Sequence, residues 1–167
     1  MEYLFPFLRG LEFYTLVLIR LFAMFAFTPL FSNNVIPVRT RIFLAAAITF
    51  VCVSFLEQTI PFQASQNLIQ YAFYMINEAL VGFCIGFVIL IFFTIYQLSA
   101  QFFSFQIGFG ISSVFDPLSQ VQIPLTGQLQ TLFGLLIFIA IGVLETSIAA
   151  VIESYKAFGI GGFEDVV

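Results

Sequence analysis

The sequence LIQYAFYMINEALVGFCIGFVILIFFTIYQLSAQFFSF, residues 68–105, decides the fold class of this chain. It contains one charged side chain, Glu78, and no proline. A continuous helix rises about 1.5 Å per residue, so this run would reach roughly 55 Å, well beyond the hydrocarbon core of a bilayer, about 30 Å thick. We therefore expect the run to be kinked, broken in two, or not confined to the bilayer.

The composition of the whole chain fits this run. The chain has 167 residues, of which 61% are hydrophobic and 8% are charged. A soluble domain carries about 25% charged residues, because its surface must face water. The chain must therefore be surrounded by lipid or by other apolar protein. It is predicted to be an integral membrane protein or a subunit of a hydrophobic assembly.

Three further apolar runs accompany the long one, at residues 11–31, 42–56 and 125–150. The second is short and would span a membrane only with help from its flanks. The N-terminus lacks the basic region and the cleavage site of a signal peptide, so the first run is expected to remain in the mature protein. The predicted fold is all-α and membrane-type, with about four long hydrophobic helical segments in hairpins, no sheet, and one domain over residues 1–167.

Arg20 lies in the middle of the first run. A buried arginine costs about 2.5–3.5 kcal/mol on insertion scales, so it should face a partner helix or a wet cavity. Glu12 lies two helical turns earlier, on roughly the same face. Two interpretations are open: a residue of a transport pathway, or a structural residue that forms an ion pair between subunits or hydrogen bonds to backbone carbonyls.

The long run contains two further features. Gly82 and Gly86 form a small-xxx-small pair, which permits close approach of another helix. Gln97, Gln101 and Ser104 share one face near the end of the run. Polar side chains aligned on an apolar helix either bond to a neighbouring helix or line water, and we expect the first use.

The segment GFGISSVFDPLSQVQIP, residues 108–124, separates the third and fourth runs and is the least membrane-like part of the middle of the chain. Asp116 followed by Pro117 suits the start of a short helical turn, and Pro124 suits the first position of the next helix. The segment is either a plain connection capped by Asp116 or a functional loop. A broken-helix substrate site near Asp116 in a small-solute transporter is a further alternative.

Several classes of function are disfavoured. There is no histidine, and no basic patch that would bind nucleic acid. The glycines at 108 and 110 lack the rest of a phosphate-binding motif. Cys52 and Cys84 make neither a disulfide framework nor a metal site, and both are expected to be small buried apolar residues. We expect no enzymatic activity, no metal and no cofactor.

The order and spacing of several motifs resemble the FliR/SctT family of type III export-gate proteins. The motifs are Pro29–Ser32 with Ile36, Pro37 and Arg41; Glu78 with Gly82 and Gly86; and Gln106, Gly108 and Gly110 followed by Asp116, Pro117 and Pro124. The resemblance covers essentially the whole chain. Two differences stand out: relatives often carry an Asn-Gly-His-like step where this chain has Ile141-Gly142-Val143, and they usually continue beyond the position of Val167. We therefore expect a C-terminal, FliQ-like part of the family to be absent from this sequence.

The resemblance implies a core subunit of the export gate in the bacterial inner membrane, at the flagellar basal body. Its implied partners are FliP-like and FliQ-like subunits, FlhB-like and FlhA-like export components, and exported flagellar proteins in transit. Members of this family assemble into a helical pore that lies largely above the membrane plane. Such an assembly would accommodate a third run too long for a bilayer.

The resemblance also assigns residues 108–124 as a plug that projects into the pore. A resting pore must be obstructed, and an obstruction that yields suits a loop with permissive glycines and apolar side chains that dewet a constriction. The implied plug residues are Gly108, Gly110, Ile111, Val114, Phe115, Asp116, Pro117, Leu118, Val121, Ile123 and Pro124. The expected packing and interface residues are Arg20, Glu78, Gly82, Gly86, Gln97 and Gln101.

Overall fold

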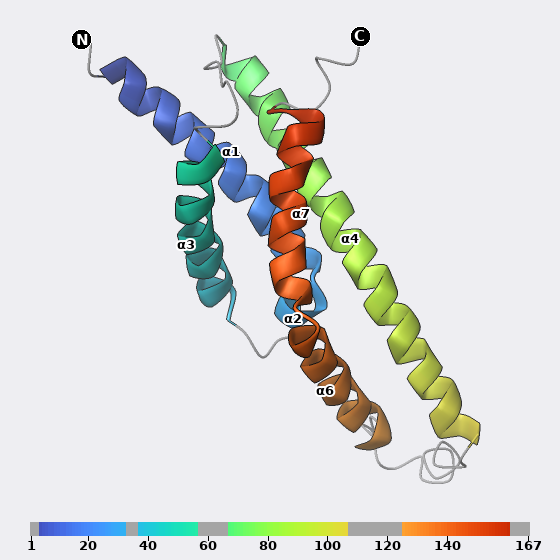
Figure 1. Ribbon diagram of the computed structural model, residues 1–167. Coiled ribbons are helices and arrows are strands. Elements are labelled where there is room, and N and C mark those ends of the chain that lie inside the picture. Colours follow the sequence, from blue (N-terminus) through green and yellow to red (C-terminus); the bar gives the residue numbers. More distant parts are fainter. Residues whose placement is uncertain (1–3, 33–36, 57–66, 107–124, 161–167) are drawn as a thin grey trace.

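The computed structural model describes residues 4–32, 37–56, 67–106 and 125–160 (Figure 1). Within these ranges the chain forms helices and no strand, which confirms the predicted all-α, membrane-type class. The helices are α1 (Leu4–Phe27), α2 (Pro29–Ser32), α3 (Val38–Leu56), α4 (Leu68–Gln106), α6 (Leu125–Ala140) and α7 (Val143–Phe158).

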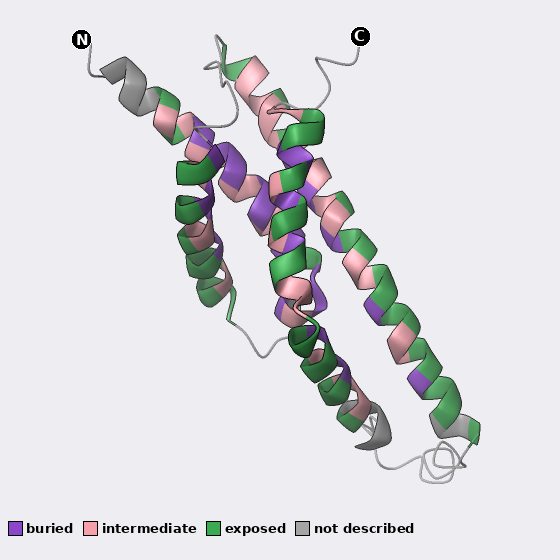
Figure 2. Ribbon diagram, viewed as in Figure 1, coloured by how far each residue is buried: buried purple, intermediate pink, exposed green. Residues whose placement is uncertain are grey.

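Helix α1 is the centre of the structure. It crosses α4 in the most extensive helix contact and packs against α3 and α7 as well. Figure 2 shows a stripe of buried residues along α1. They follow a spacing of three and four residues, which places them along one side of a helix: Phe13, Leu16, Val17, Leu21, Met24 and Phe25. This spacing directs the apolar stripe of the first run into the core.

Helix α4 shows whether the long apolar run is continuous. It is one uninterrupted helix of 39 residues from Leu68 to Gln106, so the run is not broken in two. At about 1.5 Å per residue it extends for roughly 58 Å. Of the three possibilities expected from the sequence, a helix that is not confined to the bilayer fits this length best.

The predicted single fourth run is wrong in its limits. The helix stops at Ala140, and α7 begins at Val143 after a bend of 55°. Gly142 between them has φ of 75°, a backbone conformation that glycine adopts without strain. Helix α7 then continues to Phe158, beyond the predicted end of the fourth run at residue 150.

The first two runs also differ from their predicted limits. Helix α1 ends at Phe27, before the proline of α2, because proline lacks the N–H that would continue the helix. The hydroxyl of Thr28 donates to the carbonyl of Met24 at 2.9 Å and helps to close this end. Helix α3 begins at Val38, directly after Pro37, and its 19 residues make it long enough to span.

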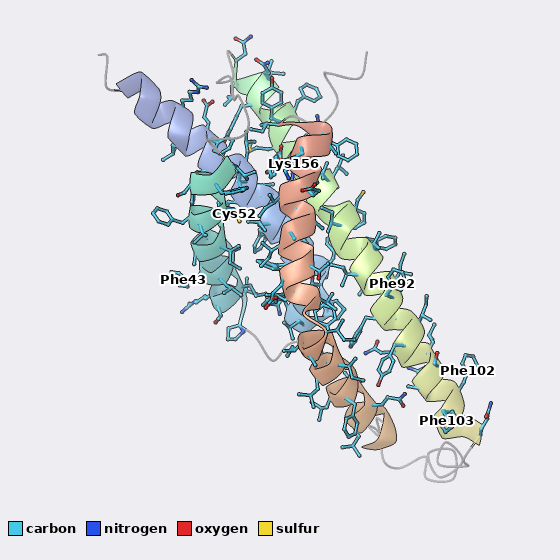
Figure 3. The ribbon with its side chains drawn as sticks, in the orientation of Figure 1. Phe43, Cys52, Phe92, Phe102, Phe103 and Lys156 are labelled. Carbon is cyan, nitrogen blue, oxygen red and sulfur yellow. The ribbon has the colours of Figure 1, made fainter. Side chains whose placement is uncertain are left out.

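Three helices in the described part of the chain are long and apolar enough to cross a membrane, and the bent pair α6–α7 would make a fourth span if it is counted as one. Their outward faces are apolar (Figure 3): Phe43 on α3 is 75% exposed, and Phe92 and Phe102 on α4 are 71% and 67% exposed. Cys84 also lies exposed on α4, whereas Cys52 is buried, so the expectation that both are buried is wrong for Cys84. This surface suits lipid or apolar protein rather than water.

Candidate functional site

A buried polar cluster joins α1, α4 and α7. Arg20 on α1 donates from Nε to Oε2 of Glu78 on α4 at 2.5 Å. The hydroxyl of Tyr155 on α7 donates to the same carboxylate oxygen at 2.9 Å. The guanidinium carbon of Arg20 lies 3.6 Å from the centre of the Tyr155 ring. One arginine therefore contacts both an anion and an aromatic face, and these come from different helices.

The remaining nitrogens of the same guanidinium reach the C-terminal part of α7. One terminal nitrogen donates to the hydroxyl of Ser154 at 2.9 Å, and the other donates to the carbonyl of Gly159 at 3.3 Å. Gly159 ends α7 with φ of 63°, and its N–H donates to the carbonyl of Tyr155. The glycine turn therefore presents a backbone carbonyl to the arginine without steric strain.

The cluster is closed to its surroundings. Arg20 and Glu78 are each 0% exposed and Tyr155 is 1% exposed. Burying one charge alone would cost several kcal/mol, but a paired and fully hydrogen-bonded set offsets that cost. Across the described residues, every buried side-chain nitrogen and oxygen has a hydrogen-bond partner. The electrostatics of the cluster therefore favour one arrangement of the three helices.

Two glycines of α4 allow the helix crossing that brings Arg20 to Glu78. Gly82 lies against the backbone carbonyl of Arg20, and Gly86 lies against that of Met24. A β-carbon at position 86 would stand 2.6 Å from the Met24 oxygen, which is inside van der Waals contact. The small-xxx-small pair thus places the backbones of α1 and α4 close together, in the manner of packed membrane helices.

The chemistry of this arrangement suits a structural role in holding helices together. The arginine, the carboxylate and the tyrosine hydroxyl bond one another, and none of them faces open space where a substrate would bind. In the parts of the chain that the structure describes, no group of three or more His, Cys, Asp or Glu side chains is placed to hold a metal ion. The cluster fastens three helices that are far apart in the sequence.

The structure places the expected packing residues in two different environments. It brings together Arg20, Glu78, Gly82 and Gly86 at the α1–α4 crossing. Arg20 pairs with Glu78 of the same chain, a carboxylate that the sequence interpretation had not linked to it. Farther along α4, Gln97 is half-buried and Gln101 is exposed. All the expected plug residues between 108 and 124 lie outside the described residues.

The contribution of α7 was missed from the sequence. Ser154, Tyr155 and Gly159 lie beyond the predicted end of the fourth run, yet all three contact the guanidinium of Arg20. A signal was present: Ser147, Val151 and Ser154 recur at intervals of four and three, the spacing of one helix face. The structure buries this face of α7.

Comparisons with known proteins agree with the resemblance. The family of bacterial export proteins, family 1, matches residues 11–167. "Flagellar biosynthetic protein FliR" of Bacillus subtilis is 29% identical over 147 residues, 88% of this chain and 56% of the relative. The protein of the same name from Aquifex aeolicus is 31% identical over 140 residues, 83% of this chain and 53% of the relative. That from Escherichia coli is 22% identical over 156 residues, 93% of this chain and 58% of the relative.

Each match covers most of this chain but a smaller share of the relative. The chain spans a little over half the length of the curated relatives it matches. The family match, in contrast, takes in nearly the whole chain, including every residue of the buried cluster. The chain therefore belongs to the family of bacterial export proteins, family 1.

Proposed function

We propose that this chain is a non-enzymatic core subunit of the flagellar protein export gate in the bacterial inner membrane. The observation that carries the proposal is the family match, together with curated relatives that are all named as flagellar biosynthetic proteins. The fold is compatible with this role, because the polar groups of the described core bond one another and fasten helices. The relatives do not favour the alternative of a small-solute transporter with a site near Asp116.

The length of α4 supports a gate that extends beyond the bilayer. A hydrocarbon core of about 30 Å covers only part of a helix of roughly 58 Å. Apolar side chains nevertheless remain exposed near both ends of α4, from Leu68 at 83% to Phe103 at 64%. The part that lipid does not cover requires apolar protein as its neighbour. FliP-like and FliQ-like subunits are the proposed neighbours, with FlhA-like and FlhB-like components as further partners.

We further propose that residues 1–167 act as a single helical unit in which residues 108–124 plug the pore. This segment joins the C-terminal end of α4 to the start of α6, and both helices belong to the same packed bundle. Its apolar side chains would exclude water from a constriction, and its glycines would allow it to yield. Unfolded flagellar proteins would pass when it is displaced.

The plug is tested by replacing its apolar side chains with serine in the full-length protein. The variant changes Ile111, Val114, Phe115, Leu118, Val121 and Ile123. The matched control changes the polar residues Ser112, Ser113, Ser119, Gln120 and Gln122 to alanine. Ion leakage is measured in inner-membrane vesicles that hold equal amounts of assembled gate. We expect leakage in the first variant and a tight membrane in the control.

The assignment to the export gate needs its own experiment. The full-length chain is purified from native membranes with its partners, and secretion of flagellar proteins is measured in a strain that lacks it. We expect unlike helical subunits to copurify and secretion to stop. Symmetric copies of this chain alone, with normal secretion in the deletion strain, would favour a transporter. A tight membrane in an assembled, secretion-competent serine variant would overturn only the plug.

A further inference from the structure

The bend between α6 and α7 is built on one residue. The N–H of Gly142 donates to the carbonyl of Ile139 at 3.0 Å, and α7 begins at the next residue. Gly142 adopts φ 75° and ψ 32°, and no side chain caps the start of α7. A left-handed conformation costs other residues roughly 1–2 kcal/mol but costs glycine almost nothing. The chain direction therefore changes by 55° without backbone strain, at a residue whose φ and ψ no side chain restricts.

Helix α7, on one side of this bend, is firmly held. Ser154 and Tyr155 belong to the cluster around Arg20. Val151 and Ser147, which follow the same face toward the bend, are 1% and 4% exposed. Hydrogen bonds, a charge–aromatic contact and buried apolar surface thus fix α7 to the α1–α4 crossing.

Helix α6, on the other side, is held differently. It packs on α4 and contacts α7, while Leu132, Leu136 and Ile139 are 54–61% exposed. It lies close to α4 at Gly134, where a β-carbon would stand 2.5 Å from the Tyr96 ring. A hydrogen bond of 3.2 Å from the Tyr96 hydroxyl to the Gln130 carbonyl also joins the two helices.

An apolar hollow of about 400 Å³, open on one side, lies between α4 and α6 beside the bend. Its lining comes from both helices and from the bend itself: Ile89, Phe92, Phe93, Tyr96, Gly134, Ile137, Phe138, Ile141 and Val143. Phe138 of α6 contacts Phe93 of α4 at one wall of the hollow. Because the hollow is open on one side, it leaves space between the two helices next to Gly142.

We propose that Gly142 is a pivot at which α6 tilts against α4, while α7 stays fixed to α1 and to the first half of α4. The hollow supplies the freedom for this tilt, and the Gly134–Tyr96 contact marks where the two helices slide. The tilt changes the separation between Gln106 and Leu125, the facing ends of α4 and α6. This inference goes beyond the proposed function, since it concerns the motion of two helices and is measured without an export assay.

Pairs of spin labels on the full-length protein in membrane vesicles test the pivot. Cys52 and Cys84 are first replaced by alanine, and cysteines are then introduced at exposed positions. One pair, Ser99→Cys on α4 and Leu132→Cys on α6, reports the tilt. The other pair, Leu80→Cys on α4 and Glu153→Cys on α7, reports the distance between α7 and the first half of α4, which should stay constant. We expect a distribution of distances at least twice as broad for the first pair as for the second.

Filling the hollow tests its role in the tilt. Ile137→Phe adds bulk to the lining of the hollow. It should narrow the distribution of α4–α6 label distances until it is about as narrow as the distribution of α4–α7 label distances. Ile139→Phe is the matched control, because Ile139 is similarly exposed on α6 but does not line the hollow. Equal widths for the two pairs would overturn the pivot. So would a broad α4–α6 distribution that Ile137→Phe leaves unchanged, with the α4–α7 pair confirming that the variant is folded.

Discussion

Gly82 on α4 lies so close to the backbone carbonyl of Arg20 on α1 that no β-carbon fits between them. The same arginine uses its side chain to reach Glu78, one helical turn before Gly82. The backbone and the side chain of a single residue on α1 therefore both determine how α4 is placed. The close crossing and the ion pair support each other.

Gly82→Ala is expected to destabilise the α1–α4 crossing, because the new methyl group overlaps a carbonyl oxygen that cannot move away alone. Forcing extra volume into a packed contact costs about 1–3 kcal/mol, and more where backbone is displaced. Gly10→Ala is the control, since nothing lies within 4 Å of a β-carbon at that position of α1. The control should gain about 0.5–1 kcal/mol from its better helix propensity. Equal unfolding free energies of the two variants in detergent would contradict this account.

Glu78→Gln should destabilise the folded chain strongly, because it leaves the Arg20 charge buried beside a neutral amide. Removing one partner of a buried pair costs about 3–5 kcal/mol. Replacing both partners with apolar residues, Arg20→Met with Glu78→Leu, should restore much of that loss. The coupling is measured by a double-mutant cycle of Arg20→Met, Glu78→Leu and the double variant, each unfolded in detergent. If the effects of Arg20→Met and Glu78→Leu on the unfolding free energy were additive, the ion pair would be energetically unimportant.

The exposed ion pair Lys156–Glu153 serves as a comparison for the buried pair Arg20–Glu78. Its atoms lie 2.8 Å apart, but the two side chains are 51% and 71% exposed. Exposed ion pairs contribute about 0–1 kcal/mol, so Lys156→Ala should change the unfolding free energy little. If Lys156→Ala lowered the unfolding free energy as much as Glu78→Gln does, burial would not be what makes the Arg20–Glu78 pair important.

Tyr155→Phe and Tyr155→Leu should separate the two contacts of the tyrosine. Phenylalanine keeps the ring beside Arg20 but removes the hydrogen bond to Glu78, at a cost of about 1–3 kcal/mol. Leucine also removes the aromatic face, and a desolvated cation–π contact adds up to about 2 kcal/mol. Unfolding free energies should therefore fall in the order Tyr, Phe, Leu. Identical values for the two variants would exclude a contribution of the ring to holding Arg20.

Gly142→Ala is expected to destabilise the α6–α7 bend by about 1–2 kcal/mol, because alanine is strained at positive φ. Gly142→Asn should cost less, since asparagine enters the left-handed region more readily than other side chains. Both variants add a β-carbon at the same position, but asparagine tolerates the backbone conformation better than alanine. If asparagine proved as costly as alanine, lost space rather than backbone strain would be the cause.

The sequence was sufficient for the fold class and for the regions in which helices occur, because long apolar runs dominate both. It also identified the glycine pair at 82 and 86, since small residues at this spacing have few other uses in an apolar helix. It did not identify the break at Gly142, because a lone glycine in an apolar run is also tolerated inside a helix. Nor did it link Arg20 to Tyr155, because such a pairing depends on how three helices cross rather than on any local pattern.

The spacing of the buried cluster along the chain has a consequence for biosynthesis. Arg20 and Glu78 are separated by 58 residues, and Arg20 and Ser154 by 134. At synthesis rates of about 5–20 residues per second, Arg20 waits roughly 3–12 s for its carboxylate and roughly 7–27 s for α7. Until Glu78 is synthesised, the first helix carries a cation without its carboxylate. The contacts of Arg20 with Ser154 and Gly159 form only after the end of α7 has left the ribosome.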